Sequence, residues 1–253
     1  MVEDRSNEVK FWAMRAKGYN KLEWTTKNDY LRQFLDSGNF SQNDIVLDIG
    51  TGTGIIAHLI APHVKKVVGI DISPDMIAQA NGKSNFTNVE FALNDARSLQ
   101  FKDGTFDKIT ARMAFHHITT DTLKAMKECY RVLKRGGMMV FSEGNPPDRA
   151  VQQRYEEIFK LKEDRITFFE DDMRTLMEQA GFKVVNSSTY VQEQASLNNW
   201  LRNSGLPQET IEKIRILHTE ADDHFKEAYS LKITEDNDVL MNWKFVIMTG
   251  VKE

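Results

Sequence analysis

The sequence predicts an α/β fold built on a doubly wound, mostly parallel sheet of seven strands with an antiparallel edge strand. From Asp44 onward, five short apolar runs alternate with helical segments, which is typical of parallel strands covered on both faces. Two more β-forming segments, 182–191 and 239–251, come late in the chain without a simple crossover between them. This arrangement indicates an antiparallel pair at the sheet edge.

The five predicted strands of the first half are joined by helices with clear boundary signals. Ser73 before Pro74 predicts a helix start, because serine caps helix N-termini and proline suits the first helical position. Apolar residues at 123, 126, 129, 132 and 133 form the stripe of a helix that we expect Gly136 and Gly137 to end. Ligands of such folds bind at the carboxyl ends of the strands. The five runs are 45–47, 67–70, 89–93, 106–111 and 138–141.

We expect one domain spanning 1–253, with a core at 41–145 and helical additions on either side. Residues 1–40 read as an amphipathic helical cap whose apolar members are Phe11, Trp12, Met14, Tyr19, Leu22 and Trp24. In the C-terminal half, 146–253, a helix near 171–179 ends before Gly181. The segments 146–168 and 195–230 are longer than ordinary connections, and we interpret them as helical insertions over the site.

The sharpest local signal is a glycine-rich turn at the end of the first predicted strand. Gly50, Gly52 and Gly54 alternate with threonines directly before a predicted helix at 55–60. Glycine permits a sharp turn and close approach of a ligand, and the helix N-terminus offers free N–H groups. The second strand ends at Asp71, where a carboxylate can accept hydrogen bonds from ribose hydroxyls. A Rossmann-like nucleotide site is therefore predicted; the alternative is that Asp71 only caps the next helix.

The glycines alone do not determine which nucleotide binds. Residues 52–57 also fit the dinucleotide pattern G-x-G-x-x-A, so an NAD(P)-dependent oxidoreductase is an alternative. Tyr130 and Lys134 have the Tyr-x-x-x-Lys spacing of dehydrogenases. They lie on a helix with an apolar stripe, however, and His117 stands where the partner serine is expected. We interpret this spacing as accidental.

The motifs that follow favour a different cofactor. After the Asp48–Gly54 turn come Asp71, then Asn94-Asp95-Ala96, then 106–118, then 133–137. Over about residues 40–145 this set resembles a class I S-adenosylmethionine-dependent methyltransferase. It is similar to the methyltransferase type 11 branch, which includes the ubiquinone and menaquinone biosynthesis enzymes. The resemblance implies methyl transfer from S-adenosylmethionine.

The resemblance also implies where the cofactor binds. The glycine turn lies against its methionyl part and ribose, and Asp71 suits the ribose diol. Ile72 and Met76 cover one face of the adenine. Asp95 accepts a hydrogen bond from the adenine amino group, and the Ala96 N–H donates to a ring nitrogen.

Three further positions carry alternatives. Tyr19 lies where related enzymes have an aromatic residue near the methionyl end, and simple packing is the other interpretation. Asp48 either binds the ammonium group or fixes the turn, and Arg112 contributes backbone below the methionyl end. The predicted cofactor-binding residues are Tyr19, Asp48, Gly50, Thr51, Gly52, Gly54, Asp71, Ile72, Met76, Asn94, Asp95, Ala96 and Arg112.

His116 and His117 are the candidate catalytic residues. A base is needed only when the methyl acceptor must lose a proton, and histidine serves this role near neutral pH. Adjacent residues on an extended strand point to opposite faces, so at most one of them is expected to reach the acceptor. The alternative is that one packs in the core and the other caps the next helix.

Composition and local sequence patterns bear on which partners, compartment and metals we expect. The formal charge of −4 argues against binding to nucleic acid, and one cysteine among 253 residues favours a reducing, cytoplasmic compartment. The first eight residues lack the pattern of a secretory signal, and there is no apolar run of membrane-spanning length. His218, Asp222 and His224 lie in an acidic segment that is typical of a solvated helix face, so no metal is expected.

We therefore expect a methyltransferase acting on a small-molecule acceptor with an apolar body. The alternatives are a protein or RNA methyltransferase, an NAD(P)-dependent oxidoreductase that uses the same glycine turn, and a nucleotide-binding module without activity. No feature of the sequence indicates an oligomeric state.

Overall fold

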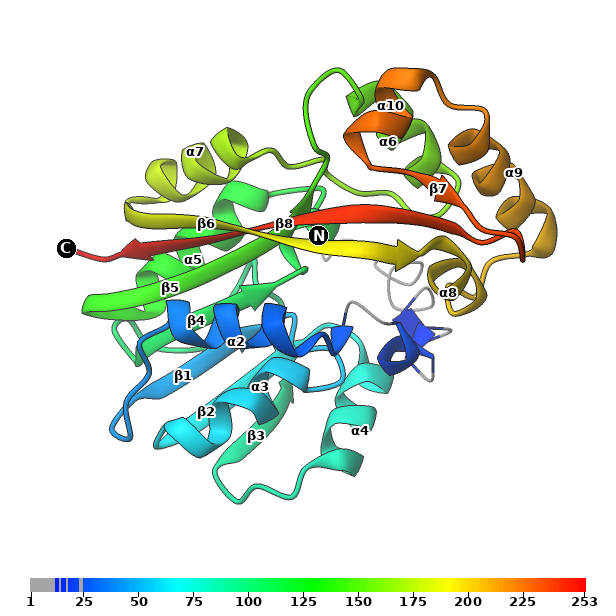
Figure 1. Cartoon of the computed structure of the whole chain (residues 1–253). Coiled ribbons are helices and arrows are strands. Elements are labelled where there is room, and N and C mark those ends of the chain that lie inside the picture. The colour runs from blue at the N-terminus through cyan, green and yellow to red at the C-terminus, as the bar shows by residue number, and fades with distance from the viewer. Residues whose placement is uncertain (1–11, 14, 17, 23–24) are drawn as a thin grey trace.

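The computed structural model describes residues 12–13, 15–16, 18–22 and 25–253. Within them the chain forms one twisted sheet with the strand order β3-β2-β1-β4-β5-β8-β6, and β7 pairs with β8 (Figure 1). Strand β8 runs antiparallel to both of its neighbours β5 and β6, while β1 to β5 are parallel. The strands are β1 (Ile45–Ile49), β2 (Lys66–Asp71), β3 (Val89–Leu93), β4 (Phe106–Arg112), β5 (Leu133–Asn145), β6 (Lys183–Ser196), β7 (Lys232–Ile233) and β8 (Val239–Val251).

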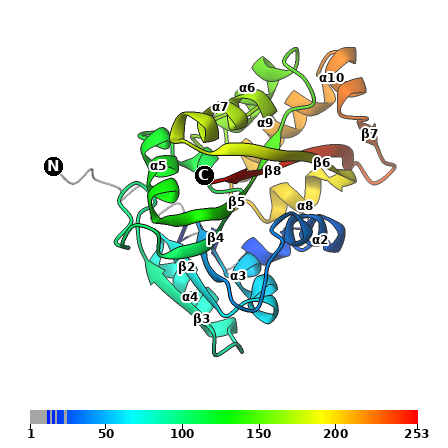
Figure 2. The same ribbon diagram turned by 90° about the vertical axis from the view of Figure 1, so that its left-hand side faces the viewer.

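Helices cover both faces of the sheet, so each face has its own buried apolar cluster. Figure 2 shows α2 (Asn28–Ser37) and α3 (Ile55–Ile60) on one side, and α5 (Thr122–Val132) and α7 (Glu170–Ala180) on the other. Helix α4 (Pro74–Lys83) packs against β2 and β3. The near-continuous apolar strands follow from this double cover, because neither face of the central strands meets water.

Four more helices gather at one end of the sheet, beyond its parallel part (Figure 1). They are α6 (Gln152–Lys160), α8 (Leu197–Arg202), α9 (Gln208–Thr219) and α10 (Asp223–Ala228). We call this group the helical cap; it is distinct from the N-terminal cap that the sequence predicts at residues 1–40. It is held to the sheet through β8, which α8 and α9 contact, and α6 packs on α9. The long strands β6 and β8 extend past the body of the sheet and carry the cap.

The predicted doubly wound, mostly parallel fold is confirmed, and several elements begin and end where the sequence indicates. Ser73 caps α4 by accepting a hydrogen bond from the Met76 N–H at 3.3 Å. Helix α7 ends at Gly181, whose φ of 107° is the left-handed conformation that glycine tolerates best. The antiparallel strand β8 lies one place in from the edge, which β6 occupies.

Two expectations are wrong. Helix α5 ends at Val132, so Gly136 and Gly137 do not end it but lie within β5, where Gly136 has a φ of 74°. His116 and His117 are not on a strand. They belong to a short 3₁₀ helix, η4 (Phe115–His117), so their side chains are not forced to opposite faces.

The N-terminal part is described only in segments. It contains a 3₁₀ turn, η1 (Tyr19–Lys21), and helix α2; Leu22 is buried. Phe11, Met14 and Trp24, which the sequence places on an amphipathic helix, lie outside the described residues. A second 3₁₀ turn, η3 (Ala61–His63), follows α3. Of the helices described, none combines the length and apolar character needed to cross a membrane.

Candidate active site

The glycine turn closes tightly against neighbouring segments. Gly50 has a φ of 61°, and a Cβ on it would lie 2.5 Å from the Ala114 Cβ. Gly54 has a φ of 82°, and a Cβ there would lie 2.8 Å from His58 Cε1. Any other residue at these two positions would be strained both by backbone conformation and by contact. The glycines are therefore needed for the turn itself as well as for ligand access.

Beside the turn, the carboxyl ends of β2 and β3 line a cavity of about 670 Å³. Asp71 accepts hydrogen bonds from the N–H groups of Gly52 and Ser73, each at 2.9 Å. Burial raises the pKa of Asp71, and these N–H donors oppose the rise. Nine of the thirteen predicted cofactor residues line this cavity: Tyr19, Gly50, Gly52, Asp71, Ile72, Met76, Asn94, Asp95 and Ala96.

The remaining four predicted residues lie behind the cavity. The Asp48 carboxylate accepts from Thr51 Oγ1 at 2.6 Å and from Thr110 Oγ1 at 2.7 Å, and so ties the turn to β4. Burial raises the pKa of Asp48 to about 6. Arg112 is buried and donates to the Thr25 carbonyl at 3.1 Å. These contacts favour the turn-fixing interpretation of Asp48, and Gly54 joins the same supporting layer.

A second, larger cavity adjoins the first and encloses about 910 Å³ including its open mouth. Its lining combines aromatic and aliphatic side chains with a group of charged ones. It comes from the end of β5, from β8, from the N-terminal segment and from the helical cap. Phe159 lies in this wall and packs on Trp200, with ring centroids 5.5 Å apart. Phe168 lies apart from this wall, in the buried apolar cluster on the side of the sheet that α5 and α7 cover.

The two cavities share part of one wall. Trp12, Tyr19, Met113 and His117 line both of them. Met113 has a φ of 55°, and its sulfur accepts a hydrogen bond from the Gly144 N–H at 3.1 Å. A ligand in the smaller cavity would therefore be separated from a ligand in the larger cavity only by these four side chains.

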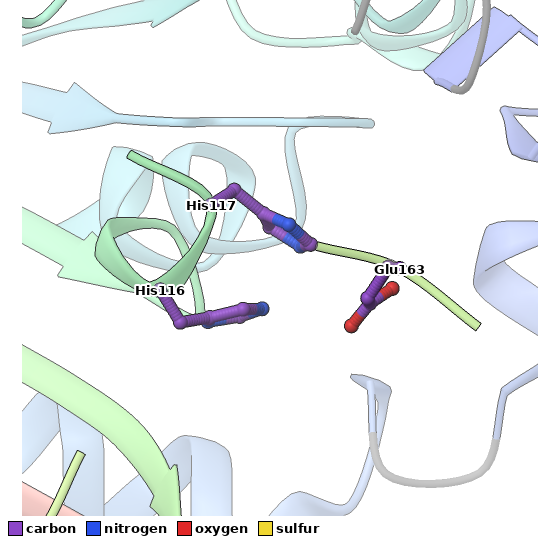
Figure 3. A group of neighbouring side chains, drawn as sticks. All are labelled: His116, His117 and Glu163. Atoms are coloured by element: carbon purple, nitrogen blue, oxygen red, sulfur yellow. The ribbon is translucent and has the colours of Figure 1, made fainter. Parts of the chain in front are cut away.

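His116 and His117 lie in this region, with ring centroids 3.9 Å apart. Figure 3 shows both rings directed toward the carboxylate of Glu163, and the ligand atoms of the three residues lie within 4.8 Å of one another. His117 reaches both cavities, whereas His116 lines only the larger one among the described residues. Burial, followed by the neighbouring His116, lowers the pKa of His117 well below its ordinary value, so the ring is neutral near pH 7.

Glu143 on β5 holds His116 in place. One carboxyl oxygen accepts from the N–H groups of Ala114 (3.2 Å), Phe115 (2.8 Å) and His116 (3.3 Å). The other lies 2.5 Å from His116 Nδ1. Burial raises the pKa of Glu143 to about 8 and lowers that of His116 well below its usual range. Both shifts favour the uncharged forms of the two groups.

Glu163 is surrounded by cations. Its Oε2 pairs with Arg15 at 2.7 Å and with Lys162, and its Oε1 lies 3.5 Å from Arg165 Nη1. Burial alone would raise the pKa of Glu163, but Lys162 and the other cations hold it well below the ordinary value. A divalent cation between His116, His117 and Glu163 would face these three positive side chains at short range, which opposes metal binding.

The other metal candidates do not meet. His218 is buried, not solvated, and donates from Nδ1 to the Ile214 carbonyl at 2.7 Å. Asp222 caps α10 by accepting from the Phe225 N–H, and His224 pairs with Asp148 at 3.1 Å.

Sequence reasoning missed the charged groups around the histidines. Glu143 had a signal, because it is a charged residue two positions after the apolar run 138–141. Lys162, Glu163 and Arg165 form a charged run after aromatic residues, which is more often a solvated face. Here all three side chains are at most 5% exposed.

The comparisons with known proteins agree with this geometry. Residues 47–141 match the family model of the methyltransferase domain. The chain is 26% identical to the protein named uncharacterized methyltransferase YcgJ of Bacillus subtilis, over 98% of this chain and 99% of the relative. The chain is an S-adenosylmethionine-dependent methyltransferase. The demethylmenaquinone methyltransferase of Thermotoga maritima is 40% identical to this chain. The match covers 41% of this chain and 44% of that relative.

Solved structures share the fold of the methyltransferase. The crystal structure of YcgJ from Bacillus subtilis has a TM-score of 0.79 at 22% identity and covers 90% of the chain and 99% of its own. The phosphoethanolamine N-methyltransferase 2 of Haemonchus contortus, solved in complex with S-adenosyl-L-methionine, has a TM-score of 0.64 at 20% identity over 94% of the chain and 57% of its own. With S-adenosylmethionine as cofactor, the NAD(P)-dependent alternative is no longer retained.

The smaller cavity fits this cofactor. The turn at Gly50 and Gly52 leaves backbone N–H groups close to the cavity without a Cβ between. The Asn94 Oδ1 is buried and has no hydrogen-bond partner among the described residues, so an N–H or O–H donor on a ligand would satisfy it. Asp71 would hold the ribose diol, and Ile72 and Met76 would lie against the adenine.

Replacing Asp71 tests the ribose assignment. We expect Asp71→Ala to weaken S-adenosylhomocysteine binding by about 1–3 kcal/mol, because buried ribose hydroxyls lose their acceptor. Calorimetric titration measures the change, and thermal unfolding checks that the turn remains folded. Asp75→Ala, an exposed acid on the first turn of α4, is the matched control and should bind normally. Unchanged affinity in folded Asp71→Ala would contradict the assignment.

The Glu143 pKa gives a pH-dependent prediction. The folded protein retains the Glu143 proton up to about pH 8, whereas an ordinary glutamate releases it near 4.5. This group therefore contributes stability below pH 4.5 that is lost as the pH rises toward 8. Glu143→Gln keeps an uncharged donor, so the stability of the wild type relative to this variant should fall over that interval. Urea unfolding at several pH values measures it, and a constant difference from pH 5 to 8 would refute the assigned shift.

Proposed function

We propose that this methyltransferase methylates a small molecule with an apolar, ring-containing body that binds in the larger cavity. The observation that carries the proposal is the shared wall, because a methyl donor in the smaller cavity would face the larger cavity and its aromatic residues across Trp12, Tyr19, Met113 and His117. Cavities lined by apolar and aromatic side chains together with placed polar groups are typical of small-molecule sites. The relative named demethylmenaquinone methyltransferase supports the same substrate class.

S-adenosylmethionine supplies an electrophilic methyl group when it is bound. The protein's own contribution is alignment and exclusion of water. The cap residues Phe159 and Trp200 and the strand residue Trp243 close the larger cavity with apolar surface, which keeps the acceptor oriented and dry.

We further propose that His117 takes the proton of an acceptor O–H or N–H group. Its ring lines both cavities and is neutral near pH 7, which is the protonation state that a general base requires. The carboxylate of Glu163 lies nearby (Figure 3) and stabilises the imidazolium that forms. His116, whose Nδ1 is bonded to Glu143, acts as a positioning residue in this scheme.

The buried free Cys129 supports a cytoplasmic location.

The substrate class is tested with methyl-labelled S-adenosylmethionine and a fractionated cell extract. We expect a labelled product, separated chromatographically from S-adenosylmethionine, in the small-molecule fraction of the extract. Heat-inactivated protein is the control for nonenzymatic transfer. Label in the protein or RNA fraction would replace this proposal with the alternative class.

His117→Ala tests the base. We expect methyl transfer to the labelled acceptor to fall about 100- to 10,000-fold, which is the usual contribution of a general base. Affinity for S-adenosylhomocysteine should stay near that of the wild type. His63→Ala, an exposed histidine at the end of η3, should change neither quantity. Retained turnover in His117→Ala would remove this residue from the mechanism.

A further inference from the structure

Arg165 has hydrogen-bonding groups without a partner in the part of the chain that the structure describes. Its side chain is 5% exposed and lines the larger cavity. Nη1 lies 3.5 Å from Glu163 Oε1, at the limit of a hydrogen bond. Nε and Nη2 are buried and have no partner among the described residues. The guanidinium lies over the Phe159 ring, 4.3 Å from its centroid.

Such an arrangement is costly unless a ligand completes it. A buried charged donor without a partner loses its hydration and gains nothing in return. Nε and Nη2 form the edge of the guanidinium on which two N–H bonds run parallel. This edge matches the two oxygens of a carboxylate, which it binds through a pair of charge-assisted hydrogen bonds.

In the cluster around Arg165, basic side chains outnumber carboxylates. Arg15, Lys162 and Arg165 surround the single carboxylate of Glu163, and Arg15 and Lys162 occupy its Oε2. Glu143 is engaged by His116 and by three backbone N–H groups. Arg165 is therefore left with the weakest contact in the cluster. A further negative group in the cavity would balance the excess of positive charge.

We propose that the methyl acceptor is an aromatic carboxylic acid whose carboxylate binds the Nε–Nη2 edge of Arg165. Its ring would lie among Tyr155, Phe159 and Trp200, which line the same cavity. The carboxylate is a binding handle, and a second polar group of the acceptor receives the methyl. This inference rests on the proposed small-molecule function and adds the chemical class of the substrate.

Two probes of equal size test the inference: 2-naphthoate and its neutral amide, 2-naphthamide. Each is titrated calorimetrically into the protein saturated with S-adenosylhomocysteine, whose own binding is measured first. We expect the wild type to bind the acid at least about tenfold more tightly than the amide, as expected for a charge-assisted pair. Arg165→Met should abolish this preference and leave amide binding unchanged.

Arg174→Met is the matched control, because Arg174 is a half-exposed arginine on α7 that pairs with Glu178 at 3.9 Å. It should retain the preference for the acid. Arg165→Gln serves as a second variant if Arg165→Met does not fold, and it should also lose the preference. Equal affinity of the wild type for acid and amide, or an Arg165 variant that still prefers the acid, would overturn the inference.

The two proposals fail in different ways. Label in the protein or RNA fraction of the extract would remove the small-molecule function. Label in a metabolite without a carboxyl group would leave that function standing and overturn only the role of Arg165. A labelled product that retains a free carboxyl group supports both.

Discussion

One buried carboxyl group, that of Glu143, holds the backbone on which the larger cavity depends. The chain leaves β4 at Arg112 and turns through η4, and three consecutive N–H groups of that turn point at the same Glu143 oxygen. These N–H groups have no strand partner, because the polypeptide has left the sheet. A buried backbone donor must find an acceptor, and Glu143 on β5 supplies it. The positions of His116 and His117 follow from this contact.

The helical cap depends on a different constraint. Strands β6 and β8 pair over almost their whole length, from Lys183 beside Val251 to Ser196 beside Leu240. They therefore extend past the parallel part of the sheet and give α8 and α9 a surface on which to pack (Figure 1). One apolar cluster runs from α2 and α3 through the sheet into the cap. The wall of the larger cavity is thus continuous with the hydrophobic core and is packed as part of it.

Local patterns determined what the sequence could predict. The glycine turn, Asp71 at the end of β2 and the Ser73 cap depend on neighbours a few residues away, and all three occur as expected. The path of β8 between β5 and β6 could not be read in the same way, because strand order is set by contacts between distant segments. The 3₁₀ conformation of His116 and His117 depends on Glu143, 27 residues beyond His116.

The difference between local and distant contacts also explains why the sequence predicted the residues of the smaller cavity better than those of the larger one. Most residues of the smaller cavity follow strand ends in a fixed order, so they could be predicted from the sequence; Tyr19, in the N-terminal segment, was predicted from the family resemblance alone. Whether those residues contact the cofactor as assigned stays a prediction. The charged run Lys162 to Arg165 gave no such indication, because its burial comes from Phe159, Trp200 and the N-terminal segment, which fold over it from three parts of the chain.

The N-terminal segment closes both cavities at once. Trp12 and Tyr19 stand in both walls, and Arg15 between them is fastened to Glu163 at 2.7 Å. The Asn199 amide on α8 donates to the Lys21 carbonyl at 3.2 Å, and Asn20 accepts from Thr53 beside the glycine turn. The same short stretch of chain therefore contributes to the walls of both cavities, so a change in its position would alter the two sites together.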